Sequence, residues 1–426
     1  MTVAGKTWNI RLVVVCFSAL AISLPIAWIS LAKLFLSLAF LVEFARRALK
    51  METQSPLQSL RMAQFIPWAI VLMFVSLLWT SADTETALQS VIKHSKLIFI
   101  LVPVVLIRSW SEARIALMAF AVGQIFLMLS AWLISFGVPL PWATNLGGKN
   151  AVFSTYLDQS IILATSAAIF WHLRSANVWP RVFAIACAVS ALAIVLLLLE
   201  GRTGYVIVMA LVGLAAAWQC PARWRKPMYG LAAVMVVACV GWAYLHAQQA
   251  PVHNNGAMAR DYLEPGSGLT SDAWRLHAWR RSAQAMAAAP IVGTGTGSWK
   301  SAIAPFEGER FIAIFGTSPI SNPHQEYLLW GVEFGVLGCF ALLAFFGMAA
   351  MDARQFNPHV THALWSVLAA CALACMFNSV LYDDLIGDYF CITLGLLFSA
   401  GLHKPPSAAQ ATDTPSLPST AKPHAH

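Results

Sequence analysis

Charged residues are scarce in this chain of 426 residues: Asp, Glu, Lys and Arg make up 11% of it, and hydrophobic residues make up 59%. So few polar side chains cannot cover the surface of a water-soluble globule, which excludes that class of protein. The apolar residues come in runs of roughly 17 to 25, the length that crosses a hydrocarbon layer of about 30 Å as a helix. The net charge of +8 comes mostly from basic residues between these runs and does not indicate a nucleic-acid partner.

Cysteine is absent from the longest hydrophilic segment, residues 248–323, and all eight cysteines lie in or at the ends of apolar runs. The segment is therefore not a disulfide scaffold, and without a Cys-X2-Cys pair nothing indicates a cysteine metal site. A cleavable signal peptide is not evident, because the first apolar run lacks a small-residue cleavage site and is followed directly by another. We expect the first run to be retained.

The apolar runs predict an all-α integral membrane protein with about twelve transmembrane helices. Nine helices occupy residues 1–247, one large outer loop occupies 248–323, three helices occupy 324–402, and a disordered tail occupies 403–426, where Pro, Ser, Thr and Ala dominate. The predicted spans are 10–27, 29–46, 63–80, 94–108, 115–137, 153–172, 182–199, 204–220, 229–247, 325–350, 361–381 and 386–402.

Lys and Arg are concentrated in alternate loops, which predicts the orientation of the chain. With the N-terminus inside, every inner loop carries an excess of basic residues, whereas the short outer loops carry few, among them Lys93, Lys96 and Arg202. We therefore expect both termini to face the cytoplasm and the loop 248–323 to face outward.

The middles of the predicted spans contain almost no ionisable residues. A transporter or flippase would need charge near the midplane or along a passage across the membrane. The polar groups gather instead toward the outer ends of the spans, among them Asp158, Glu333, Asp383 and Asp384. This distribution indicates a site at the outer interface.

The large loop contains a predicted helix at 271–289, with Ser271 as its N-cap and Pro290 after its end. Arg275 and Trp279 share one face of this helix, whereas Arg281 points elsewhere. The alternating glycines of Gly293-Thr-Gly-Thr-Gly-Ser follow it. They favour a close backbone turn over a phosphate cradle, because no strand-to-helix context and no Lys-Ser/Thr pair support a nucleotide site.

Two further features are candidates for chemistry. His324 begins a span directly after the large loop, where its imidazole either removes a proton from a substrate or merely caps a helix. Arg202 lies in the short outer turn Glu200-Gly-Arg-Thr-Gly. Its guanidinium either snorkels to lipid headgroups or holds a phosphate with two parallel hydrogen bonds.

Together these motifs resemble the O-antigen ligase family. His324-Gln325-X9-Gly335-X2-Gly338 is similar to its signature, in which a histidine opens the span after a large periplasmic loop. Arg275-X3-Trp279, followed by the glycine run, and the turn around Arg202 resemble its other motifs in the same order. One departure is Arg202-X3-Val206, where the family pattern has leucine.

The resemblance implies a GT-C-like, metal-independent glycosyltransferase of the bacterial inner membrane, with a periplasmic active site and no cofactor. It would transfer a polysaccharide from an undecaprenyl-pyrophosphate carrier to a sugar hydroxyl of lipid A–core, with inversion at the anomeric carbon. His324 would be the base, and Arg202 and Arg275 would bind the pyrophosphate. The residues that would orient the acceptor or support these groups are Glu200, Gln325, Tyr327, Arg281, Asp383 and Asp384.

Alternatives remain open at this stage. An O-antigen polymerase would use the same donor, but polymerases more often have two sizeable outer loops. A protein O-oligosaccharyltransferase would use Ser or Thr as acceptor and usually has a longer C-terminal region. A lipid-linked sugar flippase is disfavoured by the charge-free span middles, and a metal-dependent reaction would require Asp383 and Asp384 to bind Mg²⁺ or Mn²⁺.

Overall fold

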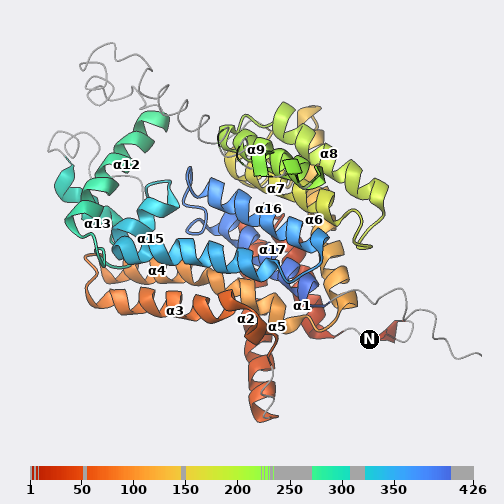
Figure 1. Cartoon of the computed structure of the whole chain (residues 1–426), viewed down its shortest axis with the longest axis horizontal. Coiled ribbons are helices and arrows are strands. Elements are labelled where there is room, and N and C mark those ends of the chain that lie inside the picture. The colour runs from red at the N-terminus through yellow and green to blue at the C-terminus, as the bar shows by residue number, and fades with distance from the viewer. Residues whose placement is uncertain are drawn as a thin grey trace, which may run out of the picture.

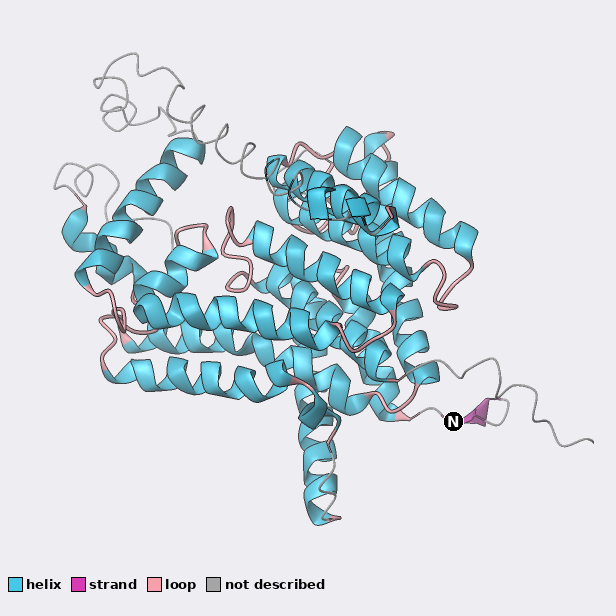
Figure 2. Cartoon of the chain, in the orientation of Figure 1, coloured by secondary structure: helices cyan, strands magenta, loops and turns pink. Residues whose placement is uncertain are grey.

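The computed structural model describes residues 2–3, 6–7, 9–50, 55–144, 150–221, 223–224, 226–228, 230, 234, 271–307 and 322–403. Within this part the protein is helical apart from a two-stranded antiparallel ribbon near the N-terminus, β1 (Thr2–Val3) and β2 (Lys6–Thr7) (Figure 2).

The first eight α-helices are α1 (Ile10–Ala21), α2 (Ile26–Leu49), α3 (Arg61–Val75), α4 (Thr84–Ser95), α5 (Leu101–Leu106), α6 (Trp110–Ser135), α7 (Tyr156–Leu173) and α8 (Arg181–Leu197). They are followed by α9 (Arg202–Gln219), α12 (Ser271–Ala288), α13 (Trp299–Ile303), α15 (Glu326–Ala353), α16 (Pro358–Ala374) and α17 (Asp384–Leu402), with short 3-10 turns at Pro56–Ser59, Ser76–Leu78, Lys96–Ile100 and Ala304–Phe306.

Seven helical segments in the described part are long and apolar enough to cross a membrane, and α1, α8 and α16 are shorter apolar helices. The seven are Ile26–Leu49, Arg61–Leu78, Thr84–Leu106, Trp110–Ser135, Arg202–Gln219, Glu326–Ala353 and Asp384–Leu402. The chain is a multi-pass membrane protein, but the predicted count of twelve spans is not confirmed. The predicted span 229–247 and the predicted tail fall almost wholly outside the described residues, and the predicted orientation stays a prediction.

One predicted span begins too late, because it leaves out most of a helix that precedes it. The span predicted at 94–108 is preceded in the structure by α4, so that one candidate span runs from Thr84 to Leu106. Lys93 and Lys96 therefore lie within this segment and not in a loop. Hydropathy missed it because α4 is polar. One of its buried polar side chains, the His94 imidazole, lies 3.1 Å from the Glu333 carboxylate inside the bundle.

The core of the bundle surrounds α17, which is almost completely buried. Helices α5, α6 and α16 pack against it, and α7 packs against α8, α9 and α16 (Figure 1). Helix α2 extends away from the bundle at its far end and is mostly exposed. Its apolar surface fits a helix that faces lipid.

Helix starts are fixed by local side-chain caps. Thr155, for example, accepts a hydrogen bond from the backbone N–H of Asp158 at the start of α7, and Asn357 accepts one from Val360 at the start of α16, with Pro358 in the first helical position. Helices α12 and α13 pack on α15 at one end of the molecule. Helix α12 lies where a helix was predicted at 271–289.

Candidate functional site

The first turns of α7, α15 and α17 meet at one end of the bundle, and the buried carboxylate of Glu326 fastens two of them together. The Glu326 carboxylate accepts hydrogen bonds from the backbone N–H groups of Leu381 at 2.9 Å and Tyr382 at 3.3 Å, and from the Trp330 indole at 2.9 Å. Its own N–H donates to the Cys375 carbonyl at 2.8 Å. The loop that joins α16 to α17 is therefore held against the start of α15.

His324 stands two residues before α15 in a backbone conformation that is uncommon for a residue other than glycine. Its φ is +49°, and its N–H donates to the side-chain oxygen of Asn322 at 2.9 Å. The preceding carbonyl, of Pro323, accepts a hydrogen bond from the Trp279 indole of α12 at 3.0 Å. Left-handed backbone in such a residue needs support from its surroundings, and here α12 and a buried asparagine supply it.

The imidazole of His324 is connected to Asp158 through Asn378. His324 Nδ1 lies 3.2 Å from Asn378 Oδ1, which also accepts the Ser379 N–H at 3.0 Å. The Asn378 amide nitrogen donates to Asp158 Oδ1 at 3.5 Å. These two partners fix the orientation of the amide, so its oxygen faces His324 and Nδ1 must carry the proton. Nε2 of the neutral ring is then the basic nitrogen.

The surroundings of His324 keep its ring neutral. Burial lowers the pKa of His324 below its ordinary value, the hydrogen bond to Asn378 raises it, the charge of Arg275 lowers it, and that of Asp158 raises it. Burial dominates, so the pKa is lowered on balance. Arg275 of α12 and Asp158 of α7 are thus both close enough for their charges to act on the ring.

The acidic pair Asp383–Asp384 is bound by lysine. Lys96, which is 2% exposed, donates to the carbonyls of Tyr382 at 3.1 Å and Asp383 at 2.8 Å, and lies 3.4 Å from an Asp384 carboxylate oxygen. Burial raises the pKa of Asp383 to about 6, although Lys96 and Lys93 lower it. Among the described residues no group of three or more His, Cys, Asp or Glu is arranged to hold a metal ion.

The turn that carries Arg202 packs against the start of α7. A Cβ atom added to Gly201 would lie 2.4 Å from Ser160 Oγ, and one on Gly204 would lie 2.5 Å from the same atom. Both glycines are therefore required for this approach. Arg202 itself is the first residue of α9 and is exposed, as is Glu200, so both stand at the end of α7 where Asp158 lies.

The glycine run is a backbone clasp and not a phosphate cradle. Gly293, Gly295 and Gly297 all have positive φ. The N–H groups of Thr294 and Gly295 donate to the carbonyls of Val332 and Glu333, each at 2.9 Å, and the N–H of Val336 donates to the Pro290 carbonyl at 2.8 Å. Helix α15 supplies these groups because it is broken at Gly335, whose φ is +64°. The prediction of a close backbone turn is confirmed.

Three further predicted residues have partners of their own: two lie at the start of α15, and one lies in α12. The Gln325 side chain caps α15 by accepting the Leu328 N–H, and the Tyr327 hydroxyl donates to the Ala372 carbonyl at 3.0 Å. Both thus hold α15 in place. Arg281 lies farther along α12, where it donates to Gln284 at 3.0 Å.

Sequence reasoning did not select Asn378 or Lys96, and it noted Asp158 only as one of several outer acids. No short motif contains these residues: Asn378 and His324 are 54 positions apart. The buried pair His94 and Glu333 was missed for the same reason. Their 3.1 Å contact is surrounded by the rings of Trp330, Phe334 and Tyr382.

Comparison with known proteins identifies the central part of the chain. Residues 187–343 match the model of the family described as O-antigen ligase. The matched segment contains Arg202, Arg275 and His324, but not Asp158 or Asn378. The resemblance predicted from the motifs is thereby confirmed as an O-antigen ligase domain over a little more than a third of the chain, and this family comprises enzymes that ligate or polymerise lipid-linked glycans. No curated protein matches the chain.

Proposed function

We propose that this protein is an O-antigen ligase that transfers a polysaccharide from undecaprenyl pyrophosphate to a sugar hydroxyl of lipid A–core at the periplasmic face of the bacterial inner membrane. The transfer inverts the anomeric carbon and needs no metal ion or cofactor. The observation that carries the proposal is the neutral His324, whose tautomer is set by Asn378. Arg275 and Asp158 are both close enough for their charges to act on the ring.

His324 is suited to act as the general base. Its unprotonated Nε2 is available near neutral pH, because the pKa of His324 is lowered. When Nε2 takes the hydroxyl proton of the acceptor, the ring becomes positive. The hydrogen bond from Nδ1 to Asn378 and the nearby Asp158 carboxylate then stabilise the charge. Both groups are in place before the reaction begins.

The proposed transfer is a single displacement of the pyrophosphate by the acceptor oxygen. The acceptor oxygen loses its proton to His324 and forms the new glycosidic bond from the face opposite the leaving group, while the bond between the anomeric carbon and the pyrophosphate oxygen breaks. Its electron pair leaves with the undecaprenyl pyrophosphate. Arg202 and Arg275 bind this leaving group and offset its developing negative charge without a divalent ion.

The remaining predicted residues have supporting roles in this proposal. Gln325 and Tyr327 hold the first turn of α15, which directly follows His324. Glu200, Asp383 and Asp384 line the same end of the bundle and are suited to hydrogen-bond sugar hydroxyls. The charge of Arg281 lowers the pKa of the Glu307 carboxyl, whereas burial raises that pKa. We therefore propose that Arg281 contributes to binding the acceptor sugar only together with Glu307.

The closest alternative is an O-antigen polymerase, since the family also comprises polymerases and both reactions need the same base and the same donor site. The single large outer loop predicted at 248–323 favours the ligase. A protein O-oligosaccharyltransferase would place a Ser or Thr hydroxyl at His324 Nε2.

The test is transfer in vitro by the purified full-length protein, with carrier-linked glycan and lipid A–core in excess EDTA. We expect wild-type transfer to resist EDTA and His324→Ala to abolish it, while His403→Ala, which removes a histidine at the far end of α17, retains it. Transfer by folded His324→Ala would show that the histidine is structural. Loss of wild-type transfer in EDTA would redirect attention to Asp383 and Asp384, and extension of carrier-linked glycan in place of transfer to lipid A–core would identify a polymerase.

A further inference from the structure

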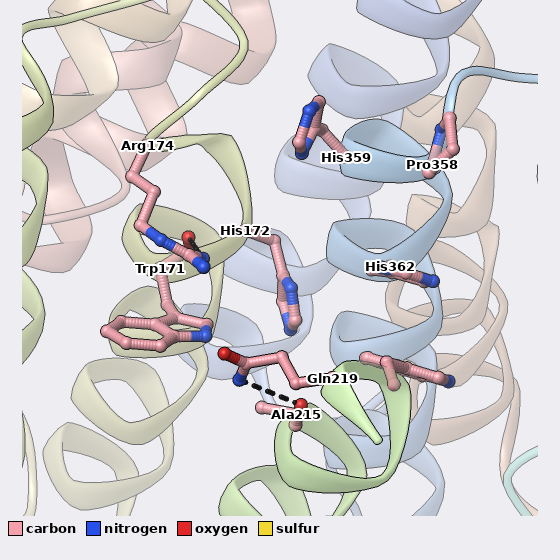
Figure 3. A pocket seen from close by; sticks show the side chains of 9 residues that line it. Trp171, His172, Arg174, Ala215, Gln219, Pro358, His359 and His362 are labelled. Atoms are coloured by element: carbon pink, nitrogen blue, oxygen red, sulfur yellow. Dashed lines mark hydrogen bonds between the residues drawn. The ribbon is translucent and has the colours of Figure 1, made fainter. Parts of the chain in front are cut away.

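A polar cavity lies at the opposite end of α7 from Asp158. It is formed where the last turn of α7, the last turn of α9 and the first turn of α16 meet (Figure 3). Its volume is about 150 Å³, roughly ten times what one water molecule requires. Asp158 and His172 are separated by fourteen residues of helix, or about 21 Å. The cavity is therefore distinct from the site around His324.

The polar lining of the cavity is basic. His172 and Arg174 come from α7, and His359 and His362 come from α16. The nine described residues that line the cavity include no carboxylate. Gln219 adds one amide oxygen, and its amide nitrogen donates to the Ala215 carbonyl at 3.0 Å. A lining in which N–H donors and the charge of Arg174 outnumber acceptor oxygens, with no carboxylate, suits an anion.

His172 is the group that most clearly lacks its partner. The residue is only 5% exposed, and its Nε2 has no hydrogen-bond partner among the described residues. Its ring lies between α7 and α16, in the midst of the labelled side chains (Figure 3). A buried polar atom without a partner costs free energy of about 1–3 kcal/mol, so a ligand that accepts its hydrogen bond would remove this cost.

Aromatic side chains surround the basic groups. Trp218 stacks on His362 with ring centres 4.4 Å apart and planes 2° apart, and the guanidinium of Arg174 lies 4.0 Å from the centre of the Trp171 ring. Tryptophans near the ends of membrane helices are typical of the interface between lipid and water. This setting places the cavity at the depth of lipid headgroups and favours a lipid over a soluble anion.

We propose that this cavity binds the phosphate group of an anionic membrane lipid. Arg174 supplies the charge, and His172, His359 and His362 supply hydrogen-bond donors, while the tryptophans contact the glycerol and upper acyl region. Basic pockets between membrane helices are a known means of recognising anionic headgroups. The proposal does not depend on the glycan-transfer reaction.

The test is calorimetric titration of the full-length protein, in neutral detergent, with dihexanoyl phosphatidylglycerol. Dihexanoyl phosphatidylcholine, inorganic phosphate and Zn²⁺ are titrated in parallel. We expect saturable binding of the anionic lipid at least tenfold tighter than that of either phosphatidylcholine or inorganic phosphate. His172→Phe, which keeps an aromatic ring, and Arg174→Gln should each weaken this binding about tenfold, the loss expected for one hydrogen bond to a charged group.

Two further variants keep the test decisive. His359→Gln changes an exposed residue at the rim, so it reports on the cavity even if His172→Phe does not fold, and we expect it to weaken binding several-fold. Arg61→Gln removes an exposed positive charge outside the cavity and should leave binding unchanged. Equal weakening by Arg61→Gln, equal binding of inorganic phosphate, or binding of Zn²⁺ alone would each overturn the proposal.

Discussion

Replacing Asn378 with leucine tests the arrangement around His324 most directly. Leucine has the same branched skeleton of side-chain heavy atoms but accepts no hydrogen bond, so it removes the contact between Asn378 Oδ1 and His324 Nδ1. In the resting enzyme this is an ordinary hydrogen bond of 3.2 Å. It becomes charge-assisted when the ring takes a proton, and such bonds contribute about 1.5–3 kcal/mol. We therefore expect turnover to fall about 10- to 150-fold.

The assay is initial-rate transfer at saturating donor, with folding checked by thermal unfolding of each variant in detergent. KM for the donor should change little, because Asn378 does not contact the pyrophosphate in the proposed reaction. Asn357→Ala is the matched control. It removes an asparagine that caps α16 at its far end and should cost about 1 kcal/mol of stability without lowering turnover.

A double substitution separates an effect through His324 from a general disturbance. If Asn378 acts by orienting the ring, Asn378→Leu should have almost no further effect on the residual rate of His324→Ala. Additive losses in the double variant, or wild-type turnover in folded Asn378→Leu, would refute the reasoning.

Three further predictions follow from the same geometry. Arg275→Gln should lower kcat/KM about 10²–10³-fold, the range for losing one preorganised group that stabilises a developing anion, whereas Arg280→Gln, exposed on the same helix, should not. In the proposed reaction neutral His324 is the active form, and its pKa is lowered. Initial rates across a pH series should therefore be constant above about pH 7 and fall as the pH drops below the ordinary histidine value of about 6.5. The acid limb of Arg275→Gln should move to higher pH, because a charge that lowers this pKa is gone. Gly335→Ala should lower the free energy of unfolding by at least about 1–3 kcal/mol, since its φ is +64° and the added Cβ would lie 2.4 Å from the Ile291 backbone. Gly347→Ala, whose added Cβ meets nothing within 4 Å, should not lower it. Unfolding in mixed detergent measures both variants.

The sequence predicted those features that depend on local composition. The apolar helices α6 and α15 coincide closely with predicted spans, because a long run of apolar side chains has few alternatives to a membrane helix. His324 was found because its spacing to Gly335 forms a motif. The structure then gives that spacing a physical reason, since the break at Gly335 lets the clasp after α12 bond to α15.

Features that depend on folding were not predictable in this way. The start of the span at Thr84 was missed because α4 carries polar residues, among them Glu85, Gln89 and Lys93, that break the apolar run. The link from His324 through Asn378 to Asp158 joins three helix ends that are distant in the chain. A single asparagine in a polar loop carries no signal of such a role until the loop is placed.

The clasp that follows α12 has a consequence for how such an enzyme can diversify. Its bonds to α15 run mostly between main-chain atoms, with one more from the Thr294 hydroxyl to the Val332 carbonyl at 3.1 Å. Its hold on α15 therefore depends little on the side chains between Pro290 and Gly293. Ile291 and Val292, within the clasp, are 65% and 45% exposed and are free to change with little effect on where α12 sits. If the protein acts as proposed, this surface can be altered to suit a different glycan while Trp279 continues to hold the residue before His324. Variation in specificity then need not disturb the geometry around His324.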